Sequence, residues 1–234
     1  MRNSLFMTEL VARLKRDGIA ETMRKAVRYM SGRAKNGDDF DKIREVETSQ
    51  FEPVWKLKVN GKNASAAKRY EPVTDADFCH GLSAFHGDRA ETTFVDLGCG
   101  KGRALILAAE AGFGNVEGVE FSSVLSSIAR KNILKLRIAN ASILTGDAAE
   151  YQFTRPHILL FMFNPFDASV MRVVAENIVK SGDFSPDYIH YCNPACARQL
   201  DALPQYRRVI SDSRVAAWQK IQFESKNSEK IEYK

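Results

Sequence analysis

The chain has 234 residues, of which 44% are hydrophobic and 27% charged, and its formal net charge is +5. Its 14 Phe, 7 Tyr and 2 Trp are enough to build a buried core, which excludes a disordered protein. The most apolar run, 158–163, has six residues, whereas a membrane-spanning helix needs about 20. Residues 1–30 carry charges throughout, unlike a secretory signal. The sequence therefore predicts a cytoplasmic protein with one main globular domain.

Positive charge is concentrated at the start of the chain. Residues 1–70 hold 16 Lys and Arg against 9 Asp and Glu, whereas residues 71–234 hold 18 against 20. Apolar residues at helical spacing predict two basic amphipathic helices over 5–30, followed by a polar loop over 31–41 and a short strand over 54–59. We interpret residues 1–70 as a basic helical extension that acts as a lid or docking face. Binding to RNA or an anionic membrane is the alternative.

The four cysteines, Cys79, Cys99, Cys192 and Cys196, stand at unrelated spacings. Only the last two are close in sequence, and a single C-x3-C pair is a poor zinc signal. We therefore expect free thiols in a reducing compartment and no metal site.

From residue 92 onward, short apolar runs alternate with helical patterns. Strands are expected at 92–97, 115–121, 142–146, 157–163 and 188–192, with helices over 103–111, 123–133, 170–179 and 195–203. Such alternation is typical of a parallel sheet with helices on both faces. Two last strands, 207–215 and 218–223, are joined by a tight turn, which forces antiparallel pairing. The expected fold class is α/β: a Rossmann-like, doubly wound, seven-strand sheet with five parallel strands and a C-terminal antiparallel hairpin.

A glycine-rich turn follows the first of these strands and opens a helix. It reads Asp-Leu-Gly-Cys-Gly-Lys-Gly over 96–102. Glycines allow the backbone to approach a ligand closely, and the helix start directs N–H groups at the same place. Glu120 ends the second strand, where a carboxylate can accept from both ribose hydroxyls, and Asp147 follows the third, near an adenine amine. Together these features predict an adenosine pocket.

The spacing of the glycines distinguishes between adenosine cofactors. A dinucleotide fingerprint reads G-x-G-x-x-G, whereas here Arg103 stands in place of the last glycine, and no phosphate-binding G-x-x-x-x-G-K-[ST] motif is present. Asp96 is badly placed for a pyrophosphate but suits a ligand with an amino group and a sulfonium. A nicotinamide-dependent oxidoreductase is the less favoured alternative.

Four segments carry a resemblance to a known family: FVDLGCGKG (94–102), VEGVEFS (116–122), TGDAAEY (145–151) and FNPF (163–166). In these the chain resembles the class I, seven-strand S-adenosylmethionine-dependent methyltransferases. With RYEPV (69–73) before the core, it is similar to small bacterial methyltransferase-domain proteins. It also resembles seven-strand protein-lysine methyltransferases, in which a Tyr before the core helps to cover the cofactor. The resemblance implies that residues 71–234 form the catalytic domain.

The resemblance also implies roles for individual residues around S-adenosylmethionine. Asp96 is expected near the methionine amino group, Glu120 on the ribose hydroxyls and Asp147 near adenine. The expected cofactor-binding residues are Tyr70, Asp96, Gly98, Cys99, Gly100, Gly102, Glu120, Phe121, Asp147, Ala148 and Asn164.

The acceptor site is expected after the fourth strand, at Asn164, Pro165 and Phe166. Asn164 is the candidate catalytic residue, and Pro165 and Phe166 are candidate substrate contacts. Amine-directed methyltransferases carry Asn-Pro-Pro and an aromatic residue here, and this chain is one Pro short, which disfavours nucleobase amines. We therefore expect methyl transfer to an N, O or S atom of a protein side chain or small molecule, with nucleic acid less favoured. A non-catalytic module that binds the cofactor is the other alternative.

Overall fold

The computed structural model describes residues 39–50, 52 and 70–221. The helices expected over 5–30 and the strand expected over 54–59 lie outside the described residues. The strands are β1 (Thr93–Leu97), β2 (Asn115–Glu120), β3 (Ala141–Thr145), β4 (Ile158–Phe163), β5 (Tyr188–Cys192), β6 (Tyr206–Ser211) and β7 (Val215–Lys220). The helices are α2 (Asp39–Arg44), α3 (Asp75–Leu82), α4 (Arg103–Glu110), α5 (Ser123–Lys135), α6 (Ala168–Lys180) and α7 (Ala197–Asp201), with 3-10 turns η3 (Ala148–Glu150) and η4 (Gly182–Phe184).

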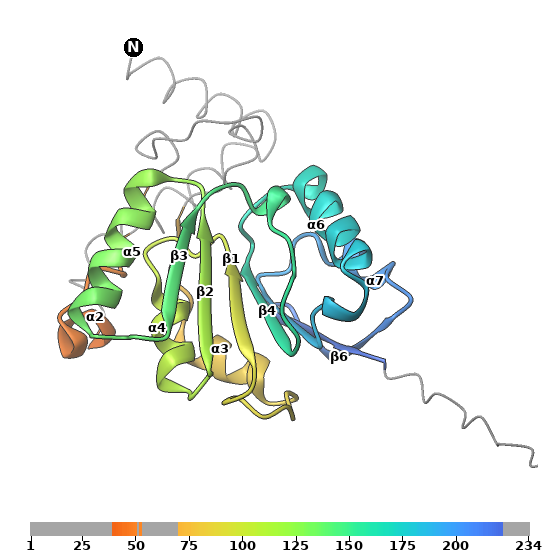
Figure 1. The fold of residues 1–234 in the computed structure, drawn as a ribbon, viewed down its shortest axis with the longest axis horizontal. Coiled ribbons are helices and arrows are strands. Elements are labelled where there is room, and N and C mark those ends of the chain that lie inside the picture. The colour runs from red at the N-terminus through yellow and green to blue at the C-terminus, as the bar shows by residue number, and fades with distance from the viewer. Residues whose placement is uncertain (1–38, 51, 53–69, 222–234) are drawn as a thin grey trace, which may run out of the picture.

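All seven strands form one sheet in the order β3-β2-β1-β4-β5-β7-β6 (Figure 1). The first five strands pair in parallel, and β7 runs antiparallel to both β5 and β6. The strand order reverses between β1 and β4, and ligands of open α/β sheets bind at the carboxyl ends of the strands at this position. The predicted α/β fold, with five parallel strands and a terminal hairpin, is confirmed.

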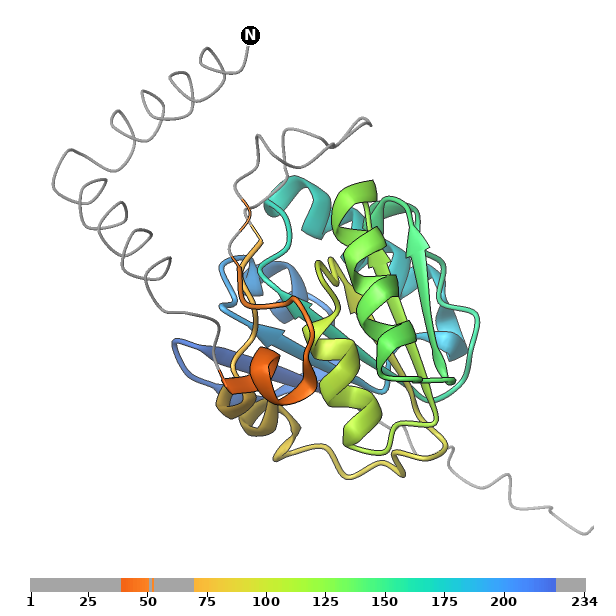
Figure 2. The same cartoon turned by 90° about the vertical axis from the view of Figure 1, so that its left-hand side faces the viewer.

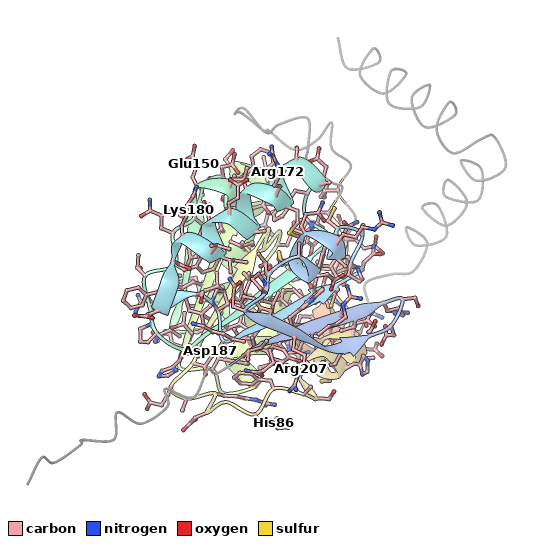
Figure 3. All side chains as sticks on the ribbon, turned by 90° about the vertical axis from the view of Figure 1, so that its right-hand side faces the viewer. His86, Glu150, Arg172, Lys180, Asp187 and Arg207 are labelled. Atoms are coloured by element: carbon pink, nitrogen blue, oxygen red, sulfur yellow. The ribbon has the colours of Figure 1, made fainter. Side chains whose placement is uncertain are left out.

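The sheet separates two apolar cores because successive side chains along a strand point to opposite faces. Phe94 of β1 packs with helices α3, α4 and α5, whereas Val95 packs with α6 and α7. Figure 2 shows α4 and α5 on the first face, and Figure 3 shows α6 and the β6–β7 hairpin from the opposite side. The central strands are buried on both faces, which explains the unbroken apolar run of β4. Within the described ranges, no helix is long and apolar enough to cross a membrane.

The terminal hairpin turns earlier than expected. The expected strands 207–215 and 218–223 are wrong in their bounds, because Val215 begins β7 instead of ending β6. The Asp212 carboxylate accepts hydrogen bonds from the backbone N–H groups of Arg214 and Val215, both at 2.8 Å, and so fixes the turn there. Residues 215–218 are then buried between β5 and β6.

Part of the polar loop expected over 31–41 is helical. Helix α2 has Asp39 and Asp41 in its first turn and Lys42 and Arg44 in its last, which matches the helix dipole, and it buries Phe40. The chain after α2 runs along α4 and α5, on the face seen in Figure 2. Residues 39–50 therefore pack on the sheet domain, while the division of the chain at residue 70 stays a prediction.

A buried histidine lies between β5 and α3. The His190 side chain is fully buried, and its ring stands against Gly81, where an added Cβ would lie 1.9 Å from Nε2. Burial lowers the pKa of His190 to about 3. In the unfolded chain His190 binds a proton below a pH of about 6.5, whereas in the folded chain it stays neutral until the pH is far lower. Stability is lost as the pH falls through this window.

The free energy of unfolding should show this loss. Between pH 7 and pH 5 we expect the wild type to lose about 2 kcal/mol more than His190→Gln, measured by urea denaturation. His86→Gln, at an exposed position, is the control and should follow the wild type. Equal pH dependence of His190→Gln and the wild type would show that His190 is protonated in the folded state.

Candidate functional site

A cavity opens at the carboxyl ends of β1, β2 and β4, where the strand order reverses. Residues 70–73, which precede α3, form one wall of this cavity. Its lining residues are Tyr70, Glu71, Pro72, Val73, Asp96, Gly98, Cys99, Gly100, Arg103, Ala104, Val119, Glu120, Phe121, Leu125, Gly146, Asp147, Ala148, Phe161, Phe163, Asn164, Pro165, Phe166 and Val170. Every residue expected at the cofactor and acceptor sites is among them except Gly102.

The glycine turn between β1 and α4 is close to its surroundings on both sides. Gly98 and Gly100 have φ values of +90° and +54°, a region that favours glycine. A Cβ on Gly98 would lie 2.5 Å from Cβ of Pro165, and one on Gly100 would lie 2.3 Å from the Tyr70 ring. The turn therefore admits no side chain at these positions, and its backbone faces the cavity.

Gly102 does not line the cavity and stands at the start of α4. It has φ of +84° and is the residue that precedes α4, and a Cβ there would lie 3.2 Å from Cβ of Ala129 on α5. Gly102 thus allows the helix to begin and to pack closely on α5. The helix then contributes Arg103 and Ala104 to the cavity wall.

Glu120, at the end of β2, holds the glycine turn. One carboxylate oxygen accepts from Gly100 N–H at 2.9 Å and the other from Ser122 N–H at 2.8 Å. Burial raises the pKa of Glu120, while the backbone donors oppose this change. A carboxylate has about four acceptor positions, so Glu120 can also accept from the two hydroxyls of a ribose.

Asp96 is buried at the start of the same turn. Its Oδ1 accepts no hydrogen bond from any residue that the structure describes. Burial raises its pKa well above the ordinary value, and the neighbouring Glu120 adds to this effect. A buried polar atom without a partner is costly, and a cationic donor at this place would satisfy it and favour the carboxylate. The site thus favours a ligand that brings a positive charge.

A third acid stands after β3. Asp147 lines the cavity, and its Oδ1 accepts from Ala149 N–H at 2.9 Å, which begins the turn η3. Phe121 and Ala148 line the same part of the cavity and supply apolar surface. This arrangement suits a flat heterocycle with a polar edge.

Asn164 follows β4 on the other side of β1. It has φ of +38°, which Asn tolerates better than most residues, and its backbone N–H donates to the carbonyl of Cys192 at 3.1 Å. Its Oδ1 is buried and has no donor within the described part of the chain. Pro165 and Phe166 complete this end of the cavity. Oδ1 of Asn164 is therefore available to accept a hydrogen bond from a ligand in the cavity.

Sequence reasoning missed several cavity residues. Leu125 and Val170 line the cavity from α5 and α6, and an apolar residue at helical spacing gives no sign of lining a pocket instead of packing in the core. Arg103 was noted only as the residue that breaks a dinucleotide motif, although it lines the cavity and is 4% exposed. The Asp41 carboxylate and the hydroxyls of Thr48 and Ser49 bind it, and no sequence spacing indicates that contact.

The residues present fit S-adenosylmethionine. Oδ1 of Asp96, which has no partner among the described residues, matches the methionine amino group, and Glu120 can accept from the ribose. Gly98 and Gly100 place side-chain-free backbone in the wall of the same cavity. A seven-strand sheet of this order with such a cavity defines the class I S-adenosylmethionine-dependent methyltransferases.

Comparison with known proteins gives the family. Residues 88–231 match the family model described as "Methyltransferase domain", and the chain belongs to this family. S-adenosylmethionine is the cofactor of this chain. No curated protein sequence matches the chain.

Solved structures share the fold. An RNA methyltransferase from Salinibacter ruber, in complex with S-adenosyl-L-homocysteine, aligns with a TM-score of 0.52 at 19% identity, over 67% of this chain and 97% of its own. The proposed methyltransferase yhhF from Escherichia coli aligns with a TM-score of 0.53 at 17% identity, over 64% of this chain and 88% of its own. A protein from Listeria monocytogenes, described as a predicted N6-adenine-specific DNA methylase, aligns with a TM-score of 0.51 at 12% identity. The alignment covers 64% of this chain and 51% of that protein. At these identities the likeness is one of fold.

The left-handed turn at Gly98 should be required for stability. We expect Gly98→Ala to lower the free energy of unfolding by about 1–3 kcal/mol, because the new Cβ meets Pro165 and the residue is held at positive φ. Gly146→Ala is the control, since this glycine also lines the cavity but its Cβ would make only ordinary contacts at 3.6 Å. Urea denaturation measures both, and equal stability of the two variants would contradict the geometry.

Proposed function

We propose that this chain transfers a methyl group from S-adenosylmethionine to an N, O or S atom of a protein side chain or small molecule. One observation carries the proposal: two buried oxygens without a partner among the described residues, Oδ1 of Asp96 and Oδ1 of Asn164, belong to the same cavity. They stand at the ends of the adjacent strands β1 and β4. The first fits the amino group of the cofactor, and the second is available to a donor on the methyl acceptor.

The proposed assignment of residues follows the two sides of the cavity. Asn164 orients the acceptor, and Pro165 and Phe166 contact it. The cofactor contacts are proposed for Tyr70, Asp96, Gly98, Cys99, Gly100, Glu120, Phe121, Asp147, Ala148 and the backbone of Asn164, all of which line the cavity. Gly102 is proposed to act by shaping the turn, because it does not line the cavity.

S-adenosylmethionine supplies a methyl group that its sulfonium already activates. The residues of this chain then have to orient the acceptor and exclude water, which can contribute several kcal/mol to lowering the barrier. Asn164 Oδ1 accepts a hydrogen bond from the acceptor's N–H or O–H and so directs its lone pair. The apolar rings of Phe161, Phe163 and Phe166 limit the access of water to the reacting atoms.

The nature of the acceptor is a proposal built on this end of the cavity. A single Pro after Asn164 disfavours a nucleobase amine, and a basic extension over residues 1–70 keeps nucleic acid as a less favoured acceptor. We also propose a cytoplasmic location, which the four free cysteines support. Residues 1–70 as a lid or docking extension are part of the same proposal.

Cofactor binding should depend on Glu120. We expect Glu120→Ala to weaken binding of S-adenosylhomocysteine by about tenfold or more, because it removes a charged acceptor and releases the N–H of Gly100. Glu117→Ala, on the same strand with its partners Tyr151 and Arg155, should leave the affinity unchanged. Isothermal titration calorimetry measures both. Absence of binding by the wild type would overturn the proposed function.

Methyl transfer should depend on Asn164. Asn164→Gly keeps the positive φ and removes the side chain, so we expect S-adenosylhomocysteine to bind as before and transfer to fall by about tenfold to a hundredfold. Asn193→Gly is the control. Asn193 also follows a strand, has a positive φ and precedes a Pro, but its side chain is exposed.

Incubation of each protein with methyl-labelled cofactor and a cell lysate, followed by separation of proteins and metabolites, measures the transfer. A labelled product that requires Asn164 supports the enzyme. Cofactor binding without any labelled product, from the wild type included, would favour the non-catalytic alternative.

A further inference from the structure

Lys101, in the middle of the glycine turn, is fully buried although lysines seldom are. Its ammonium lies 2.9 Å from a carboxylate oxygen of Glu47 and 3.3 Å from one of Glu52. A buried charge is tolerated only where opposite charges and hydrogen bonds compensate it. The two acids come from the segment before the sheet domain, about fifty positions earlier in the sequence. Lys101 therefore ties this segment to the turn.

The same segment is fixed at neighbouring positions. The Asn132 side chain on α5 bonds the backbone of Glu47 in both directions, at 3.1 Å each, and also donates to the carbonyl of Lys101 at 3.0 Å. Arg103 donates to the hydroxyls of Thr48 and Ser49, both at 2.8 Å. The segment thus contacts the glycine turn, the first residue of α4 and α5.

Tyr70 connects the segment to the cavity. Its backbone pairs with Glu52 in a short antiparallel bridge, and its hydroxyl donates to the carbonyl of Thr48 at 2.6 Å. The ring lies 5.6 Å from the Lys101 ammonium, within the range of a cation–π contact, and against Cα of Gly100. The position of this cavity wall is therefore coupled to the position of the Lys101 ammonium.

We propose that Lys101 is a positioning residue for cofactor binding. Its side chain does not line the cavity, so it acts through Glu52 and Tyr70, which it holds against the turn. Without the ammonium, the Glu52 carboxylate, 16% exposed, loses a buried partner and moves toward water. Because Glu52 is paired with Tyr70, the wall then moves away from Gly100. The inference rests on the proposed function, since it concerns the same cofactor cavity.

The test uses the full chain and S-adenosylhomocysteine as the probe. We expect Lys101→Met and Glu52→Gln each to weaken its binding by about tenfold, within the range of 5- to 150-fold typical of coupled sites. The double variant should be no weaker than the poorer single variant, because both changes break the same contact. Lys135→Met is the control, since Lys135 pairs with Glu45 of the same segment through exposed side chains and should leave the affinity unchanged.

Calorimetry gives the dissociation constant below the melting temperature, and thermal unfolding without ligand gives stability separately. A lower melting temperature with an unchanged dissociation constant in both single variants would show a purely structural role and overturn the inference. If Lys101→Met does not fold, Glu52→Gln decides by the same criterion. Absence of binding by the wild type would overturn the proposed function itself, whereas wild-type binding with unaffected variants overturns only the role of Lys101.

Discussion

The cofactor cavity depends on one buried carboxylate. Glu120 joins the turn after β1 to the start of α5, through its bonds to the N–H groups of Gly100 and Ser122. The turn can be held in this way only because Gly98 and Gly100 adopt positive φ and leave space for Pro165 and Tyr70. This junction between β1 and β2 fixes the turn that forms one wall of the cavity.

Sequence reasoning gave the architecture and the place of the site for a physical reason. A short apolar run such as 158–163 between turn signals indicates a strand buried on both faces, and alternation with helices then favours parallel order. Parallel order brings the carboxyl ends of all these strands to one edge. Asp96, Glu120 and Asn164 each lie within one residue of the carboxyl end of a strand, so their convergence on one cavity was predictable from the sequence.

What the sequence did not reveal arises from contacts between distant segments. Lys101 in a glycine-rich turn indicates a solvated side chain, and its burial depends on acids supplied by residues 47 and 52. The hairpin turn was misplaced because residues 207–223 offer no glycine, and the Asp212 side chain makes the turn instead. Gly102 belongs to the motif by spacing, yet it serves the packing of α4 on α5.

The position of β7 has a consequence for the synthesis of the protein. This strand is the last of the sheet to leave the ribosome, yet it lies inside the sheet, between β5 and β6, with Trp218 1% exposed. Until it arrives, the edge of β5 has unpaired backbone groups that invite association with other chains. Co-translational folding can therefore complete the half of the sheet that carries the glycine turn, but it leaves the β5 edge open until residue 220 has been released from the exit tunnel.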